Sequence, residues 1–141
     1  MQEAYLEYIL SDEKALLQPE RILALLKETA WARHYTLDTI DGIIRNSLCM
    51  GAYAGGMQVG FARCVTDATT VFYLEDVVIH LEHRGCGLGK ALVKTILAQE
   101  PICRLKGILV TDDAFSLYEP FGFVRDREIF MKKESPLNGC F

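Results

Sequence analysis

Hydrophobic positions along the first half of the chain change period several times, which predicts alternating strands and helices. Tyr5 to Leu10 alternates and predicts a first strand. Pro19 with Glu20 beside it predicts the start of a helix, and the buried face of that helix is expected to contain Ile22, Leu23, Leu25 and Leu26. A loop at 31–35 follows. Thr36 is predicted to cap a second helix, whose apolar stripe contains Leu37, Ile40, Ile43 and Ile44.

The next segments predict three strands. Leu48 to Tyr53 and Met57 to Val65 are joined through Gly55-Gly56, a sequence typical of a tight hairpin. Arg63 falls on the same face of the second arm as four apolar residues, so we expect it to pair with an acid or to lie at the sheet end. The apolar residues of that face are Met57, Val59, Phe61 and Val65. A turn at 67–70 leads into a longer apolar strand at 71–79, which gives the order βααβββ.

The C-terminal half continues the alternation. A helical stripe starts at Leu88 and ends before Pro101. Leu105 to Val110 predicts a buried strand, Asp112 to Tyr118 a short helix, and Phe121 to Met131 a final strand. The pattern therefore predicts an α/β fold of the layered α+β kind, a single domain over 1–141 with a mixed central sheet, and a disordered tail at 134–141.

Composition narrows the function classes. Half of the 141 residues are apolar and the net charge is -4, which indicates a globular domain and argues against nucleic-acid or anionic-membrane binding. No apolar run approaches the ~20 residues that span a bilayer, and the N-terminus is unlike a signal peptide. Five cysteines without a C-x-x-C pair favour a reducing compartment, and no metal site is expected. We therefore expect a cytoplasmic protein.

The most informative stretch is His83-Arg84-Gly85-Cys86-Gly87-Leu88-Gly89-Lys90, where a strand hands over to a helix. Unpaired amides at a helix N-terminus and the helix dipole favour an anion, and glycine lets a phosphate approach the backbone. A P-loop is rejected because the spacing is one residue short and Ala91 replaces the hydroxyl residue. A dinucleotide fingerprint is rejected because Lys90 replaces its third glycine.

Arg84-x-x-Gly87-x-Gly89 resembles the coenzyme A pyrophosphate turn of the GNAT superfamily of acyl-CoA-dependent N-acetyltransferases. A second patch, Thr111 to Phe123, is also similar to that family, and the likeness spans about 31–123. The resemblance implies a sheet whose central strands splay apart and hold acetyl-CoA as cosubstrate. It implies that the pantetheine arm bonds the backbone of Val77, Val78 and Ile79. The other cofactor-binding residues that it implies are Arg84, Gly85, Cys86, Gly87, Leu88, Gly89, Lys90, Asp112 and Tyr118.

The resemblance also assigns catalytic roles. Tyr118 corresponds to the tyrosine that meets the sulfur of the leaving thiolate. Glu75 or Asp76 is expected to act as the base at a distance, and strand alternation places them on opposite faces, so that one of them sees the acceptor. His80 and water are the alternatives. Trp31, Arg33 and Tyr35 are candidate substrate contacts, with Trp31 equally well explained as core.

Three functions follow from this sequence. The first is acetyl transfer from acetyl-CoA to a primary amine of a small molecule or peptide through a tetrahedral intermediate. The clustering of Glu75, Asp76, Asp112, Asp113 and Glu119 favours a cationic amine. The second is a non-catalytic acyl-CoA-binding regulatory module, and the third a scaffold for protein contacts. A monomer or a homodimer is expected.

Overall fold

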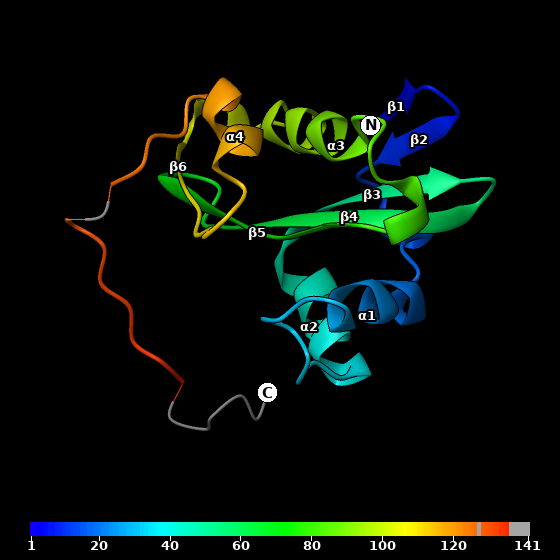
Figure 1. The fold of residues 1–141 in the computed structure, drawn as a ribbon, viewed down its shortest axis with the longest axis horizontal. Coiled ribbons are helices and arrows are strands. Elements are labelled where there is room, and N and C mark those ends of the chain that lie inside the picture. Colours follow the sequence, from blue (N-terminus) through cyan, green and yellow to red (C-terminus); the bar gives the residue numbers. More distant parts are fainter. Residues whose placement is uncertain (127, 136–141) are drawn as a thin grey trace.

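A computed structural model describes residues 1–126 and 128–135 of the chain. The fold is built on one six-stranded mixed sheet in the order β1-β2-β3-β4-β5-β6 (Figure 1). Neighbouring strands are antiparallel except β5 and β6, which are parallel. The strands are β1 (Gln2–Tyr5), β2 (Tyr8–Ser11), β3 (Leu48–Ala54), β4 (Met57–Thr66), β5 (Val71–Ile79) and β6 (Lys106–Ile108).

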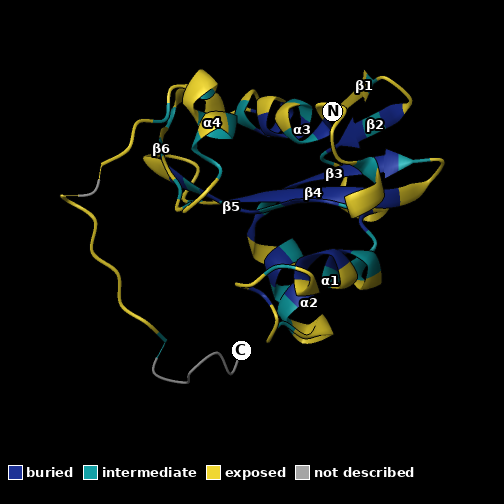
Figure 2. Cartoon of the chain, in the orientation of Figure 1, coloured by how far each residue is buried: buried dark blue, intermediate teal, exposed yellow. Residues whose placement is uncertain are grey.

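Helices cover both faces of this sheet, which confirms the layered fold expected from the sequence (Figure 1). α1 (Pro19–Lys27) and α2 (Leu37–Asn46) lie on one face, and α3 (Leu88–Leu97) and α4 (Phe115–Tyr118) on the other. Single 3-10 turns occur at Lys14–Leu16, Leu81–His83, Ile102–Arg104 and Glu119–Phe121. Because the middle strands are covered from both sides, β3 and β4 are buried along most of their length (Figure 2).

Two hydrophobic clusters fill the spaces above and below the sheet. Leu92, Val93 and Ile96 of α3 pack with Phe72 and Leu74 of β5 on one face. On the other face, the buried side chains of α1 and α2 pack with one another and with the sheet, in a cluster that includes Ile22, Leu25, Leu26, Ile40, Ile43, Phe61 and Val78. The site described below lies at the end of β5, whose residues contribute to both clusters.

Several local predictions are confirmed. Pro19 occupies the first turn of α1. Thr36 caps α2 through a reciprocal pair of hydrogen bonds with Thr39. β3 and β4 form the predicted hairpin at Gly55-Gly56. Three residues expected on buried faces are instead exposed, namely Leu37, Met57 and Val65, because each lies at the end of its element.

The N-terminal prediction was wrong. Instead of one strand from Tyr5 to Leu10, β1 and β2 form a hairpin that turns at Leu6 and Glu7, so the order begins ββαα. Leu6 has a φ of 51°, a left-handed conformation for which the sequence offers no glycine or asparagine. The turn residue therefore carried no signal from which to predict a hairpin.

The C-terminal predictions were also partly wrong. β6 covers three residues of the six expected, and α4 begins at Phe115 because residues 111–113 form a turn that Thr111 stabilises by accepting from the Ala114 amide. The strand expected at Phe121 to Met131 is absent from the described residues there. Val124, Ile129 and Met131 are exposed in an extended segment that leaves the domain (Figures 1 and 2). Of the predicted tail, residues 136–141 lie outside the described part.

None of the helices in the described ranges is both long and apolar enough to cross a bilayer.

Candidate active site

The glycine turn lies between the end of β5 and the start of α3, as the sequence indicates. Gly85 and Gly87 both have φ of 85°, in the left-handed region where other residues are strained. The first backbone hydrogen bond at the start of α3 runs from Ala91 N to Gly87 O at 3.0 Å. The amides of Leu88, Gly89 and Lys90 consequently have no partner within the helix. This leaves a group of backbone donors at the positive end of a helix dipole, suited to an anion.

Arg84 forms a hydrogen bond with the end of β5, next to this turn. Its Nε donates to the carbonyl oxygen of Ile79 at 2.9 Å. The backbone of β5 is also held from the other side, where His80 N donates to Val59 O at 2.8 Å. The guanidinium of Arg84 retains its remaining donors for a phosphate. Arg84 thus links the end of the strand to the turn that the sequence assigns to the diphosphate.

β5 and β6 part beyond their first three residue pairs. Val71, Phe72 and Tyr73 pair with Lys106, Gly107 and Ile108. β5 then continues to Ile79 without this neighbour, so the expected splay of the central strands is confirmed. The unpaired stretch includes Val77, Val78 and Ile79, the residues whose backbone we expect to bond an amide-bearing chain.

Tyr118 lies on the α3 side of this gap. Its half-buried ring packs edge-on against Phe123, with centroids 6.1 Å apart, and it joins the same cluster as Val77. Burial raises the pKa of Tyr118, and the nearby Asp113 charge adds to the shift. The phenol is therefore protonated at neutral pH and able to donate a hydrogen bond. Asp112 is exposed and lies just before α4, and among the described residues it is not brought into contact with the glycine turn.

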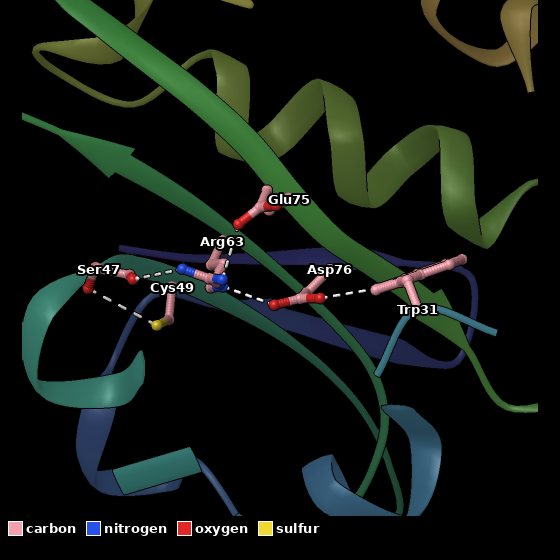
Figure 3. Close-up of polar contacts among 6 residues, drawn as sticks. All are labelled: Trp31, Ser47, Cys49, Arg63, Glu75 and Asp76. Atoms are coloured by element: carbon pink, nitrogen blue, oxygen red, sulfur yellow. Dashed lines mark hydrogen bonds and ion pairs between the residues drawn. The ribbon is translucent and has the colours of Figure 1, made fainter. Parts of the chain in front are cut away.

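A buried ion-pair cluster lies on the α1 and α2 face of β5. The Nε of Arg63 donates to Asp76 Oδ2 at 2.6 Å, and its Nη2 donates to Glu75 Oε2 at 2.8 Å (Figure 3). A third donor, Nη1, binds Ser47 Oγ at 3.2 Å. Burial by itself would lower the pKa of Arg63, but Asp76 and Glu75 outweigh it, so the pKa is raised. The sequence-based expectation that Arg63 pairs with an acid is confirmed.

The expectation that Glu75 and Asp76 point to opposite faces was wrong. Phe61 pairs with Val78 and Arg63 pairs with Glu75, so Ala62 of β4 faces two residues of β5, Asp76 and Val77. This β-bulge inserts an extra residue and resets the alternation, with Asp76 at a φ of 53°. Both carboxylates consequently contact the same guanidinium.

The two carboxylates differ in their surroundings. Asp76 is almost fully buried, with 1% of its side chain exposed, and both oxygens are engaged: Oδ2 by Arg63, and Oδ1 by Trp31 Nε1 at 2.9 Å (Figure 3). One third of the Glu75 side chain is exposed. Burial raises the pKa of Glu75 against the opposing charge of Arg63. Glu75 thus has access to solvent and a pKa moved toward neutrality, whereas Asp76 is closed off from solvent.

The predicted substrate contacts lie in the loop between α1 and α2, above this cluster. Trp31 is 55% exposed although its indole N–H is fixed by Asp76. Tyr35 is half-buried, and burial together with the charge of Asp76 raises its pKa. Arg33 is exposed. Trp31 and Tyr35 are therefore brought to the ion-pair cluster, and Arg33 is not shown to join them.

Sequence reasoning missed a cavity of about 410 Å³ between α1 and the end of β5. Charged residues of both signs line it, including Arg21 of α1, Glu28 directly after α1, and Glu82 and Arg84 from the glycine-turn side. Arg21, Ala24, Leu25 and Glu28 follow a helical spacing of three and four residues, so this face of α1 was visible in the sequence. The apolar stripe of the same helix predicted only the side that faces the core.

Comparison with known proteins agrees with this geometry. The sequence profile described as "Acetyltransferase (GNAT) domain" matches residues 45–125, which include β3 to α4. A Gibberella zeae protein provisionally named an acetyltransferase is 31% identical over 129 residues, covering 75% of this chain and 73% of the relative. The chain therefore belongs to the GNAT acetyltransferase family.

Solved structures extend the likeness to the whole fold. The crystal structure of a Xanthomonas campestris protein, described as an inferred acetyltransferase of the GNAT family, superposes with a TM-score of 0.87 at 34% identity. That match covers 94% of this chain and 96% of the other. A Deinococcus radiodurans structure superposes with a TM-score of 0.74 at 20% identity and supports the fold alone, over 94% of each chain.

Proposed function

We propose that this protein transfers an acetyl group from acetyl-CoA to the primary amine of a small molecule or peptide. The observation that carries the proposal is the joint occurrence, at one strand end, of a turn with unpaired amides and a gap between β5 and β6. The unpaired amides suit a diphosphate, and the gap between the strands suits an extended amide-bearing chain. Both lie within the part of the chain that matches the acetyltransferase family.

The residues present fit coenzyme A. A Cβ at Gly85 would meet nothing within 4 Å, so the backbone there is open to approach. Lys90 and Arg84 add positive charge without an acid between them. The backbone of Val77 to Ile79 would hold the pantetheine amides, and the residues from Arg84 to Lys90 the diphosphate. When bound, acetyl-CoA supplies the activated acetyl group.

Backbone and phenol groups of the chain would serve the chemical step. An amide of the unpaired stretch of β5 would donate to the oxyanion of the tetrahedral intermediate, a contact type worth ~10²- to 10³-fold in other enzymes. Tyr118 would donate its O–H to the departing thiolate. Because its pKa is raised, Tyr118 is a weak acid, so hydrogen bonding rather than full proton transfer is its expected contribution.

Glu75 is the better candidate for receiving the proton of the amine. Asp76 has both oxygens engaged and almost no exposure, so taking up a proton would cost it a buried ion pair. Glu75 keeps contact with solvent, and its raised pKa makes its carboxylate a stronger base than an ordinary glutamate. Asp76 then acts as a positioning residue for Arg63 and Trp31.

The acceptor is proposed to be cationic before it loses its proton. Two carboxylates and one guanidinium leave this cluster with one net negative charge. The exposed indole of Trp31 lies at its edge, and aromatic faces attract ammonium groups. A protonated primary amine would therefore be drawn toward Glu75, whose carboxylate can remove the proton.

A panel of amines tested with acetyl-CoA for release of free thiol examines the proposal directly. Turnover with at least one amine, strongly lowered but still measurable in Glu75→Gln while coenzyme A binding persists, is the expected result. With Glu75 present, the raised pKa places an acidic limb in the rate profile, where activity falls as the carboxyl becomes protonated, and E75Q should remove this limb. Tight coenzyme A binding without thiol release from any amine would favour the regulatory module instead. Absence of acetyl-CoA binding would refute both.

A further inference from the structure

We infer that the N-terminal hairpin β1–β2 positions the diphosphate turn, through the hydroxyl groups of Tyr5 and Tyr8. This inference rests on the proposed function and assigns two positioning residues to it. The hairpin is more than 70 residues away from the turn in sequence. In space it lies beside α3, the helix that the turn begins (Figure 1).

Tyr5 holds one peptide group of the turn. Its hydroxyl donates to the carbonyl oxygen of Cys86 at 2.8 Å. A trans peptide is planar, and its C=O and N–H point in opposite directions. By drawing the Cys86 carbonyl toward the hairpin, Tyr5 therefore turns the N–H of Gly87 away from it. The carbonyl dipole, which would repel an anion, is thereby directed away from the side on which the Gly87 amide points.

The same hydroxyl packs against Gly87, which adds a steric reason for glycine to its positive φ. A Cβ built on Gly87 would lie 2.6 Å from the Tyr5 hydroxyl oxygen, closer than real contacts allow. At Gly85, which has the same φ, a Cβ would meet nothing within 4 Å. The two glycines share a conformational requirement, but only Gly87 is packed directly against the hairpin.

Tyr8 holds the preceding residue of the turn region. Its hydroxyl lies 2.8 Å from Nδ1 of His83, and the two rings meet edge-on with centroids 5.5 Å apart. Tyr8 is 4% exposed, so this contact is shielded from water. Burial raises the pKa of Tyr8 to about 12, so the phenol keeps its proton at neutral pH. Tyr8 thus fixes the approach to the turn while Tyr5 fixes its apex.

The hairpin is itself anchored to α3 and to the sheet. Thr95 of α3 donates its hydroxyl to Glu3 Oε2 at 3.1 Å. β2 pairs with β3 through Ile9 and Tyr53 among others. The tyrosine hydroxyls are consequently presented from a surface that is fixed relative to both the helix and the strands. This gives the turn a defined shape before any ligand binds, which lowers the ordering cost of binding.

The test compares Tyr5→Phe with Tyr53→Phe. Tyr53 is a suitable control because its hydroxyl is buried and has no hydrogen-bond partner among the described residues, so Y53F removes the same group without a contact. Affinities for coenzyme A, dephospho-coenzyme A and pantetheine are measured by calorimetry or by the ligand-induced rise in melting temperature. Unliganded melting temperatures establish that each variant is folded. Tyr8→Phe provides a second, independent variant.

Y5F is expected to weaken coenzyme A and dephospho-coenzyme A about fivefold, the effect of one hydrogen bond. Pantetheine, which lacks the diphosphate, should bind Y5F as it binds the wild type, and Y53F should bind all three ligands normally. Equal affinity of Y5F and wild type for coenzyme A would overturn the inference. Equal weakening for pantetheine would overturn it too, since the loss would then lie outside the turn. Failure of the wild type to bind coenzyme A would instead remove the proposed function.

Discussion

Replacing Arg63 by methionine should destabilise the protein, mainly because the buried charge of Asp76 would lose its ion-pair partner. Asp76 has 1% of its side chain exposed, and Arg63 supplies its 2.6 Å ion pair. Removing one partner of a buried pair typically costs about 3–5 kcal/mol, because the remaining charge is left without compensation. Glu75, with one third of its side chain exposed, can be hydrated and should add little. We therefore expect a loss of about 4 kcal/mol in the free energy of unfolding at pH 7.

Urea unfolding followed by fluorescence measures this loss. Trp31 is the one tryptophan of the chain and its indole N–H binds Asp76, so its emission reports on the site itself. With a urea dependence of about 2 kcal/mol per molar, the unfolding midpoint should fall by about 2 M. Arg63→Lys keeps the charge but not the forked geometry, and it should cost clearly less than Arg63→Met.

A further measurement separates an unpaired buried charge from lost packing. Adding Asp76→Asn to R63M should recover about 1–2 kcal/mol, because an amide is cheaper to bury than an unpaired carboxylate. Simple additivity of the two substitutions, with no recovery in the double variant, would refute the reasoning.

The remaining predictions concern one residue each. Gly107→Ala should destabilise by about 1–3 kcal/mol because its Cβ would overlap the buried ring of Phe72, and thermal unfolding should show partial recovery when Phe72 is also changed to leucine. Thr36→Ala should cost about 1 kcal/mol by removing the α2 cap, whereas Thr36→Ser should be nearly neutral; equal losses would contradict the capping role. Tyr118→Phe should lower kcat more than it lowers the affinity for coenzyme A, and unaltered turnover would remove Tyr118 from the mechanism.

The glycine turn was predictable from sequence because its signals are local. Gly87 and Gly89 fall between an apolar strand and a helical stripe, and the structure has the turn there. The same locality explains the success at Thr36, where cap and first turn are neighbours in the chain. Packing contacts between segments that are distant in the chain give no comparable signal in the local sequence. The contact of Tyr5 with Cys86 depends on a hairpin whose turn residue, Leu6, gives no sign of its positive φ.

The ion-pair cluster was half predictable. Parity along β4 placed Arg63 on an apolar face and implied an acidic partner, which the structure supplies. The prediction from side-chain alternation along β5 was wrong because it assumes an uninterrupted strand. The β-bulge at Asp76 adds one residue, and no glycine in the sequence indicates it. The prediction of a final strand was wrong for a related reason. Alternating apolar residues such as Ile129 and Met131 form a strand only if they can pair with the edge of a sheet.

The distribution of thiols has a practical consequence for enzymology with colorimetric thiol reagents. Burial raises the pKa of Cys49 to about 11 and that of Cys64 to about 12, so neither forms appreciable thiolate at neutral pH. Cys86 and Cys103 are exposed and would consume reagent, giving a stoichiometric background that a protein-only blank must subtract. Since Cys86 lies in the glycine turn that we propose binds the diphosphate, its alkylation rate with and without nucleotide offers a footprint of occupancy that requires no acceptor amine.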